Sequence, residues 1–396
     1  MRAEGRGSGP ILTATTLASA LGIGRAATLA ALQARRSGLA ACDFAGIAQG
    51  FVGRVAAIED HALPAALARF ECRNHRLADL ALRADGFAEA VAGARGRYGA
   101  GRIAVVVGTS TSGILQSEEA YRARDPASGA LPDWFDYTHT HDMGALGHFV
   151  AAALGLEGPC FVVSTACASS ARAFADAERL IEAGFADAAV VGGADSLCRM
   201  TLRGFAALEL ISPFPSRPCA ADRAGLSIGE AAGFALLERD GEGVALLGAG
   251  ASSDGYHMSA PRPDGAGAAA AMRAALAAAG LEPGAIDYVN LHGTGTPAND
   301  AMEDAAMVSV FGAATPCSST KGFTGHTLGA AGVAEALIAA WCIEAGLLPG
   351  CLGIDAPDPA FGALVLTANR EAPLRRVLSN SFGFGGINCS LVLGRP

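Results

Sequence analysis

The chain has 396 residues, of which 51% are hydrophobic and only 17% charged, and its formal net charge is −9. This composition excludes a disordered chain, which lacks the apolar surface that a core needs. It suits a compact α/β protein with buried parallel strands. The negative charge argues against nucleic acid as a partner. No apolar run of about 18 residues lacks charge or histidine, so we predict no membrane span.

The cysteines and the N-terminal residues indicate where in the cell the protein is expected to be located. The ten cysteines show no paired spacing, as expected of reduced thiols in a cytoplasmic protein. The sequence contains no CxxC and no HxxxH, so no metal site is predicted. The basic start precedes a mildly apolar stretch, but threonines interrupt that stretch and argue against a signal peptide. Residues 1–10 are predicted to form a loose tail.

Beyond this tail, short apolar runs bounded by glycine predict strands. These runs cover 102–107, 160–163, 188–191, 232–237, 244–249, 288–291 and 364–368. Alanine-rich stretches between them predict helices at 168–183, 265–279, 301–311 and 330–345. The alternation predicts crossovers onto a parallel sheet, whereas the final VLSNSFGFGGINCSLVLG predicts a hairpin. The glycine-rich stretch around 238–255 predicts two halves, 1–240 and 241–396, although no internal sequence repeat is visible.

Cys167 follows the predicted strand 160–163 and opens the predicted helix 168–183. A cysteine in the first helical turn faces unpaired N–H groups and the positive end of the helix dipole. Both lower a thiol pKa and favour a thiolate nucleophile. The alternative is a buried structural cysteine, which most of the other nine are expected to be.

Two histidines and a lysine follow other predicted strands. His292 comes after the strand 288–291 and precedes a run of glycines and threonines, a position where α/β active sites form. His326 lies in the glycine-framed KGFTGHTLGAAG, and Lys321 in the same segment is the only lysine of the chain. Each residue alone has a structural explanation, such as a histidine that satisfies loop carbonyls. Together with Cys167 they indicate an acyl-transfer site.

Eight segments then resemble one family, in its order along the chain. They are VVVGTSTSG, GPCFVVSTACASS, VVGGADS, RPCAADRAGLSIGEAAG, DGYHMSAPRPDG, HGTGTPANDAMEDAA, STKGFTGHTLGAAG and SNSFGFGGIN. The chain resembles β-ketoacyl-acyl-carrier-protein synthases of the Cys-His-His type, within the thiolase-fold condensing enzymes. The resemblance covers nearly the whole chain. It implies the five-layered αβαβα thiolase fold with two pseudo-symmetric halves.

The resemblance also implies a reaction, the decarboxylative condensation of an acyl group with malonyl-acyl carrier protein in fatty-acid, polyene or polyketide elongation. Cys167 would accept the acyl chain. His292 and His326 would donate hydrogen bonds to the malonyl thioester carbonyl as it becomes an enolate. Lys321, paired with Glu335, would organise the site electrostatically. The resemblance implies no cofactor.

Further roles follow from the same resemblance. The backbone N–H groups of Cys167 and Phe384 would form the oxyanion hole. Thr294 and Thr296 would hold the phosphopantetheine arm of the carrier protein. Phe382 and Phe384 would act as a gate.

Four more residues complete the implied site and its partners. Asp300 and Glu303 would belong to a polar network beneath the site. Arg73 and Arg76 would dock the acidic acyl carrier protein. A homodimer is expected, and a heterodimer with a related synthase is the alternative.

The chain departs from the family pattern in a few places. Ala231 replaces a usual glycine in GEAAG, the loop within 210–218 is short, and Thr111 stands where the family often sets the depth of the acyl pocket. No role is assigned to the histidine-bearing segment 134–142.

Two other functions share the fold. A non-catalytic chain-length-factor partner lacks the nucleophile, which this chain has. A biosynthetic thiolase needs a second cysteine, for which Cys389 is the candidate. A Cys-His-Asn condensing enzyme would have asparagine in place of His326.

Overall fold

The computed structural model describes residues 9–47 and 49–395, so the predicted tail lies largely outside the described residues. Two sets of strands join edge to edge into one extended sheet. The first set is β1 (Ile11–Ser19), β5 (Ile103–Gly108), β6 (Cys160–Val163), β7 (Ala188–Asp195) and β9 (Ala231–Glu238). The second is β10 (Val244–Ser253), β11 (Tyr288–Asn290), β12 (Pro316–Ser318), β14 (Leu364–Val365), β16 (Arg376–Gly383) and β17 (Ile387–Gly394).

Both sets follow one pattern of pairing. In the first, β5 pairs in parallel with β6 and β7, and β9 runs antiparallel to both β7 and β1. In the second, β11 pairs in parallel with β12 and β16, and β17 runs antiparallel to both β16 and β10. A short antiparallel contact between β1 and β10 joins the two sets.

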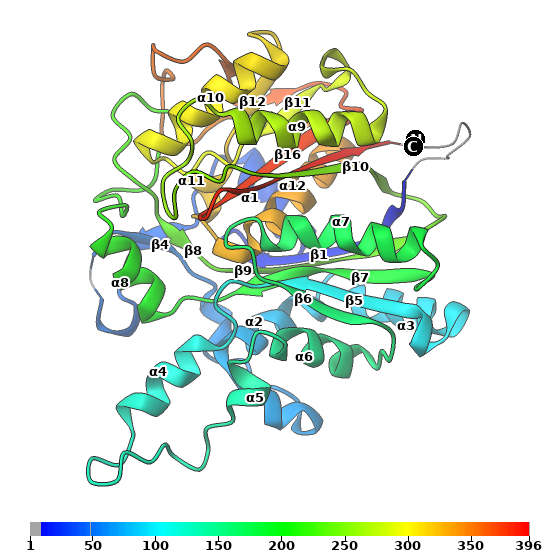
Figure 1. Ribbon diagram of the computed structural model, residues 1–396, viewed down its shortest axis with the longest axis vertical. Helices are drawn as coiled ribbons and strands as arrows, with labels where there is room; N and C mark the ends of the chain where they lie inside the picture. The colour runs from blue at the N-terminus through cyan, green and yellow to red at the C-terminus, as the bar shows by residue number, and fades with distance from the viewer. Residues whose placement is uncertain (1–8, 48, 396) are drawn as a thin grey trace.

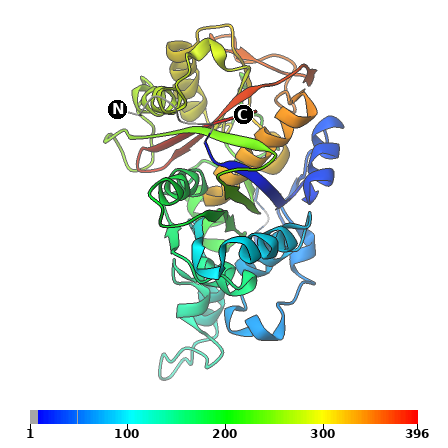
Figure 2. The ribbon, with the colours of Figure 1, turned by 90° about the vertical axis from the view of Figure 1, so that its right-hand side faces the viewer.

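Helices form three layers around these strands. The central layer is α7 (Ser169–Glu182) and α12 (Ala331–Ala345), which contact each other between the two sets (Figures 1 and 2). The outer face of the first set is covered by α2 (Arg73–Leu82), α3 (Phe87–Tyr98) and α6 (Ala145–Leu154). The outer face of the second is covered by α9 (Ala266–Ala279) and α10 (Pro297–Phe311). The predicted five-layered αβαβα arrangement with two similar halves is confirmed.

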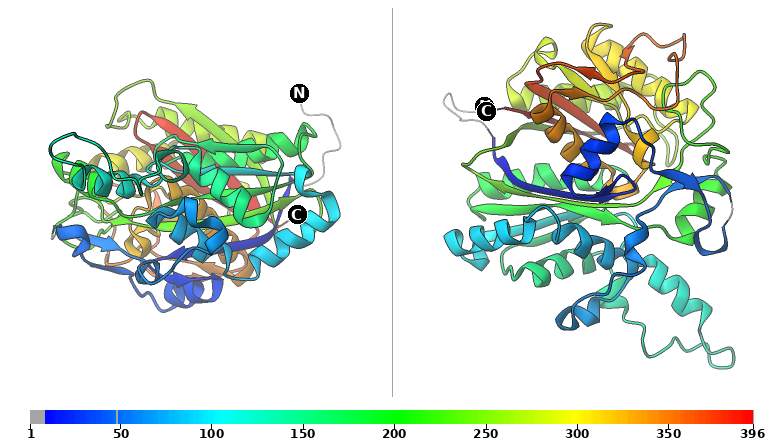
Figure 3. Two further views of the ribbon diagram at one scale, coloured as in Figure 1. Left: turned by 90° about the horizontal axis from the view of Figure 1, so that it is seen from below. Right: turned by 180° about the vertical axis from the view of Figure 1, so that it is seen from behind.

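The remaining elements lie at the margins. Helix α1 (Arg25–Gln33) packs beside α12 (Figure 3, right). Helix α4 (Ile114–Arg122) and the loop after it form an arm that projects from the first half (Figures 1 and 3). The other elements are β2 (Gly22–Ile23), β3 (Leu39–Ala41), β4 (Phe51–Gly53), α5 (Tyr137–Thr140), α8 (Arg199–Ala207), β8 (Ile228–Gly229), α11 (Lys321–Thr324), β13 (Leu347–Leu348), β15 (Arg370–Glu371) and several 3-10 turns.

The central layer is tightly packed because small residues meet there. Helix α12 is buried along nearly all of its length. A side chain at Gly332 would place its Cβ 2.4 Å from the backbone nitrogen of Ala171 in α7, so only glycine fits this crossing. Residues 328–345 form the one helical stretch, among the described residues, that is long and apolar enough to cross a membrane; 89% of it is buried within the fold.

The predicted elements are largely found, with instructive differences. All seven predicted strands are present, although 364–368 shortens to two residues in β14. Helix α10 begins at Pro297 rather than 301, because the Thr296 side chain caps it by accepting a hydrogen bond from the Asn299 N–H. The elements not predicted from the sequence include the central strand β1, the short β12, and the helices α1, α2, α3, α4, α5, α6 and α8.

Candidate active site

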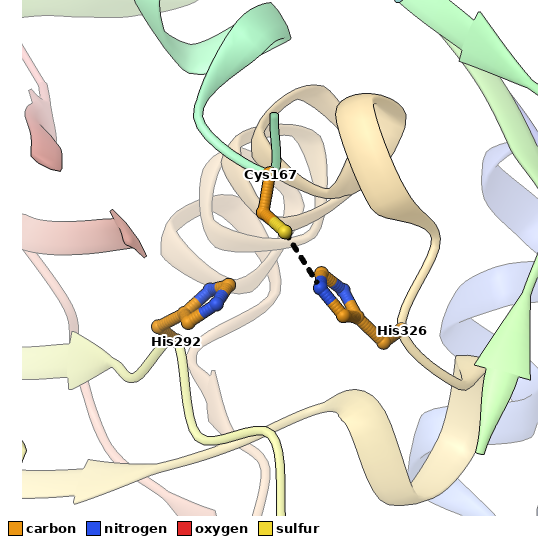
Figure 4. Close-up of side chains that lie close together, drawn as sticks. All are labelled: Cys167, His292 and His326. Carbon is orange, nitrogen blue, oxygen red and sulfur yellow. Dashed lines mark hydrogen bonds between the residues drawn. The ribbon is translucent and has the colours of Figure 1, made fainter. Parts of the chain in front are cut away.

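Cys167, His292 and His326 meet in one buried cluster (Figure 4). The Cys167 sulfur and one nitrogen from each imidazole all lie within 4.8 Å of one another, and the Cys167 Sγ to His326 Nε2 distance is 3.0 Å. The three residues are only 6%, 2% and 2% exposed. They come from three turns: the one between β6 and α7, the one after β11, and the one that follows α11. The predicted cluster of these residues is therefore present in the geometry.

The Cys167 turn is backbone-strained. Ala166 adopts a left-handed conformation with φ of +50°, which a non-glycine residue holds only when its surroundings enforce it. Helix α7 starts at Ser169, so Cys167 lies before its first turn. Burial raises the pKa of the Cys167 thiol to about 11, although the Lys321 charge and the Phe384 N–H act to lower it. The predicted low thiol pKa is therefore wrong, because desolvation outweighs the Lys321 charge and the Phe384 N–H, which lower the pKa.

Both imidazoles are neutral at physiological pH. Burial lowers the pKa of His292 and of His326 well below the usual value, and the nearby Lys321 charge lowers both further. The Lys321 Nζ lies 3.3 Å from His292 Nδ1. An ammonium can only donate, so His292 Nδ1 accepts and its proton sits on Nε2. The cluster is thus a thiol beside two uncharged rings.

Lys321 joins the cluster to a buried carboxylate. Its ammonium donates to the His292 carbonyl oxygen at 2.5 Å and forms an ion pair with Glu335. Burial raises the pKa of Glu335 to about 7, although Lys321 acts to lower it. Lys321 is 1% exposed, so it is a buried member of the site and not a surface lysine.

Two acidic residues hold the backbone of the His292 loop. Glu303 accepts the N–H groups of His292 and Gly293 at 2.8 and 2.7 Å. Asp300 accepts the N–H of Gly295 at 3.1 Å and that of Cys219 at 2.9 Å. Burial raises the pKa of both carboxyls, that of Glu303 to about 7. These residues act on loop position, as a network beneath the site would.

A cavity of about 220 Å³ opens onto the cluster. Its lining includes Thr294 and Thr296, whose hydroxyl oxygens lie 3.0 Å apart. Phe382 packs near the His292 ring, with ring centres 5.8 Å apart, and Phe384 stacks on Phe205. The Phe384 N–H bonds to the Cys167 thiol. The hairpin turn between β16 and β17 therefore closes one side of this cavity.

The docking prediction fails for Arg73. This residue is 7% exposed, and its guanidinium is held by Glu230 and Glu59. Its charge is neutralised by these two carboxylates inside the protein, because the first residues of α2 face the core. Arg76 is about one-third exposed and pairs with Glu71, so docking through Arg76 stays a prediction.

The sequence analysis also missed a buried acid, Asp195, at the end of β7. It is fully buried and accepts hydrogen bonds from the loop after β5 and from Gly329. The only sequence signal was its place in the VVGGADS segment. Cys389, the residue that a thiolase would need, lies fully buried in β17 and is not among the residues that line the cavity.

The cluster is also the one group of side chains, among those described, whose donor atoms could share a metal ion. The Lys321 ammonium beside His292 opposes a cation there. The geometry fits a nucleophile flanked by two hydrogen-bond donors better than a metal site.

Comparisons with known proteins agree with this geometry. The β-ketoacyl synthase N-terminal domain matches residues 53–242, and the C-terminal domain matches residues 244–355. Nodulation protein E of Rhizobium sp. (strain N33) is 37% identical over 304 residues, which span 73% of this chain and 75% of the relative. The mitochondrial 3-oxoacyl-[acyl-carrier-protein] synthase of Arabidopsis thaliana is 41% identical over 63% of this chain, and the match spans 59% of that relative.

Solved structures extend the similarity to the full length. A structure of a ketosynthase in complex with its chain length factor from Xenorhabdus doucetiae matches with a TM-score of 0.89 and 39% identity, over 100% of both chains. The ishigamide ketosynthase/chain length factor structure matches with a TM-score of 0.87 and 28% identity, over 98% of this chain and 100% of the other.

Proposed function

The chain belongs to the β-ketoacyl synthase family, and we propose that it catalyses the decarboxylative condensation of an acyl group with malonyl-acyl carrier protein. One observation carries this proposal: the Cys167 thiol faces two neutral imidazoles in a buried cavity. A nucleophile and two hydrogen-bond donors are what acylation and enolate stabilisation require.

The first half-reaction loads the enzyme. The Cys167 sulfur accepts a hydrogen bond from His326 Nε2, 3.0 Å away; it attacks the acyl thioester carbonyl and releases its proton. The backbone N–H groups of Cys167 and Phe384 stabilise the oxyanion. The carrier-protein thiolate leaves and takes up the proton that the Cys167 thiol released, so the acyl group ends on Cys167 and no net charge forms.

The second half-reaction makes the carbon–carbon bond. Malonyl loses CO₂, and its electron pair becomes an enolate whose oxygen accepts hydrogen bonds from His292 and His326. Neutral imidazoles suit this role because each can present an N–H without acting as a strong acid. The enolate carbon attacks the acyl thioester, and Cys167 leaves as a thiolate that takes up a proton from solvent.

Supporting residues act through position and charge. Lys321, held by Glu335, keeps the His292 proton on Nε2 and lies close to the developing negative charge. Glu303 and Asp300 fix the His292 loop.

The cavity carries two further proposed roles. Thr294 and Thr296 bind the phosphopantetheine arm in it. Phe382 and Phe384 move aside to admit substrate. These side chains supply every group the chemistry needs, so we propose no cofactor beyond the carrier-bound arm.

The partners are proposed from surface features and from the family. The acyl carrier protein docks through Arg76. A second subunit, identical or a related synthase, pairs with β6, which ends the sheet and exposes 53% of Phe161. The ten cysteines are all free, which supports a cytoplasmic location. The division into halves 1–240 and 241–396 stays a proposal, supported by the matching strand order.

The chain-length-factor and thiolase alternatives are disfavoured. Cys167 is present, whereas the first function lacks a nucleophile. Cys389 does not line the cavity, so no second cysteine faces the substrate.

Mass spectrometry tests the proposal. The protein is incubated with acyl-carrier-protein thioesters of increasing chain length and then with malonyl-carrier protein. We expect an acyl adduct on Cys167 and then release of a 3-oxoacyl chain longer by two carbons. Absence of an adduct across the series, also when a related synthase chain is added, would contradict the proposed function.

A further inference from the structure

Asp195 ends β7 as a fully buried carboxylate that gathers hydrogen bonds from two distant segments. The N–H groups of Ser110 and Thr111 donate to it at 3.0 and 3.1 Å. The hydroxyls of Thr109, Ser110 and Thr111 donate at 2.5, 2.5 and 2.9 Å. The N–H of Gly329 donates at 2.6 Å. Within residues 9–47 and 49–395 no basic side chain forms an ion pair with it.

These bonds join three parts of the active site. The donors at 109–111 follow β5, whose neighbour β6 leads directly into the Cys167 turn. The Thr109 N–H donates to the Val163 carbonyl at 3.1 Å, which ties the donor loop to that turn. Gly329 comes three residues after His326. Asp195 is therefore the common acceptor between the nucleophile side and the histidine side.

Strained backbone surrounds the same point. Ser112, Ala166 and Leu328 all have left-handed φ values, of +47°, +50° and +55°. Each belongs to one of the three segments. Such conformations cost about 1–3 kcal/mol apiece and persist only where neighbouring contacts enforce them. The hydrogen bonds to Asp195 supply such contacts beside Ser112 and Leu328.

Close packing makes the junction rigid. A Cβ on Gly329 would lie 2.6 Å from the Ser110 nitrogen and 2.7 Å from the Asp195 Oδ2. Real Cβ atoms do not approach so closely, so a side chain here must push the two segments apart. The distance between the loop after β5 and the His326 turn is thereby fixed.

We propose that Asp195 is a positioning residue, whose buried carboxylate holds the loop after β5 and the turn that follows His326 in register with Cys167. The inference rests on the proposed function, because the register matters only if Cys167 and His326 act together. Nothing in the proposed chemistry requires Asp195 to touch the substrate.

The charge of Asp195 gives a readout that a purely structural role would not move. Its negative charge raises the pKa of the Cys167 thiol, whereas the Lys321 charge lowers it. Removing the charge should make the thiol easier to ionise while the register is lost. Alkylation of Cys167 and condensation should then change in opposite directions.

The experiment compares Asp195→Asn and Gly329→Ala with wild type. Asp79→Asn is the matched control, since Asp79 is also a buried acid of the first half but bonds to His61 and Arg83. Iodoacetamide labelling of the Cys167 peptide is followed by mass spectrometry at fixed pH. Condensation kcat and KM are measured with carrier-bound substrates, and folding by thermal unfolding.

We expect Asp195→Asn to lower kcat about 100-fold, as a misplacement of about 1 Å can, with KM little changed. Its Cys167 labelling should be about threefold faster or more, because a fall of about half a unit in the thiol pKa raises the thiolate fraction about threefold. Gly329→Ala should lower kcat about 10-fold without faster labelling, since the charge remains. Asp79→Asn should change neither quantity.

Two results would overturn the inference. One is a kcat within about twofold of wild type in Asp195→Asn. The other combines two observations. Asp195→Asn loses condensation, Cys167 labelling and its unfolding transition together, as an unfolded protein would, and Gly329→Ala is folded and keeps the wild-type kcat. Failure of the proposed function looks different: wild-type Cys167 would be alkylated but never acylated.

Discussion

In the first half the turn between β6 and α7 carries Cys167, whereas the corresponding turn of the second half, between β12 and α12, carries Lys321 and His326. The strands β1, β5, β6, β7 and β9 match β10, β11, β12, β16 and β17 in chain order and in pairing. The turns that follow the matching strands β6 and β12 therefore both contribute to the active site, but they carry different reactive side chains.

The difference separates a nucleophile from its electrostatic partners. The first half contributes a thiol on a strained turn and the anion Asp195. The second contributes two neutral imidazoles and the cation Lys321. The two charges act on the Cys167 thiol with opposite signs. Neither half holds a complete site, so chemistry depends on the fixed contact of α7 with α12.

Replacing the nucleophile should have the largest effect. Cys167→Ala removes the atom that carries the acyl chain, and condensation should fall by about 10⁴-fold or more. Product formation by mass spectrometry measures it. The matched control Cys389→Ala changes a buried cysteine of β17 and should retain most activity. Chain elongation by Cys167→Ala would contradict the assignment of the nucleophile to the first half.

Removing Lys321, the cation of the second half, should have the second largest effect on condensation. Lys321→Met leaves the Glu335 carboxylate buried without its partner and frees His292 Nδ1, so we expect condensation to fall about 10³-fold. Cys167 labelling should become slower, the reverse of Asp195→Asn. The double variant Lys321→Met/Glu335→Gln should fold better without regaining activity. Faster Cys167 labelling in Lys321→Met would contradict the inference that Lys321 and Asp195 shift the thiol pKa in opposite directions.

The outer layer of the first half offers a test on stability. Arg73→Ala leaves Glu230 buried and unpaired, and we expect the free energy of unfolding to fall by about 3–5 kcal/mol. Arg76→Ala, at an exposed ion pair, should cost about 1 kcal/mol or less but raise the KM for the carrier protein. Denaturant unfolding and carrier-protein kinetics separate the two. Equal stability losses would contradict the different burial of the two arginines.

Local patterns predicted an alternation of strands and helices, whereas the resemblance to a known family implied the layers and the roles of the reacting residues. Apolar runs and glycine turns indicated seven strands, four helices and the final hairpin, and motifs singled out Cys167, His292, Lys321 and His326. Strand β1 escaped because ILTATTLAS mixes small and hydroxyl residues, without a run of bulky β-branched ones. Strand β12 has only three residues.

The features that could not be predicted from the sequence depend on contacts between residues that are distant along the chain. Asp195 matters through donors 84 to 134 residues away along the chain, which no local pattern reveals. The Cys167 pKa depends on burial by many segments, and the helix-dipole argument alone predicted the wrong direction. Arg73 was expected to dock the carrier protein because its partner Glu230 lies 157 residues away along the chain and cannot be recognised from the residues around Arg73.

The smallest effect concerns pH, and it tests whether Glu303 serves the second half as Asp195 serves the first. Burial raises the pKa of Glu303 from 4.5 to about 7, so the folded state holds its proton more tightly than the unfolded chain does. Its contribution to stability is thus present below about pH 4.5 and is lost as pH rises through about 7. From this group alone the free energy of unfolding should fall by about 3 kcal/mol between pH 4.5 and 8. Glu303→Gln should flatten that fall in denaturant titrations, and the exposed Glu157→Gln should not. An unchanged slope in Glu303→Gln would mean that the N–H groups of His292 and Gly293 keep this carboxyl ionised at low pH, and that their bonds outweigh its burial.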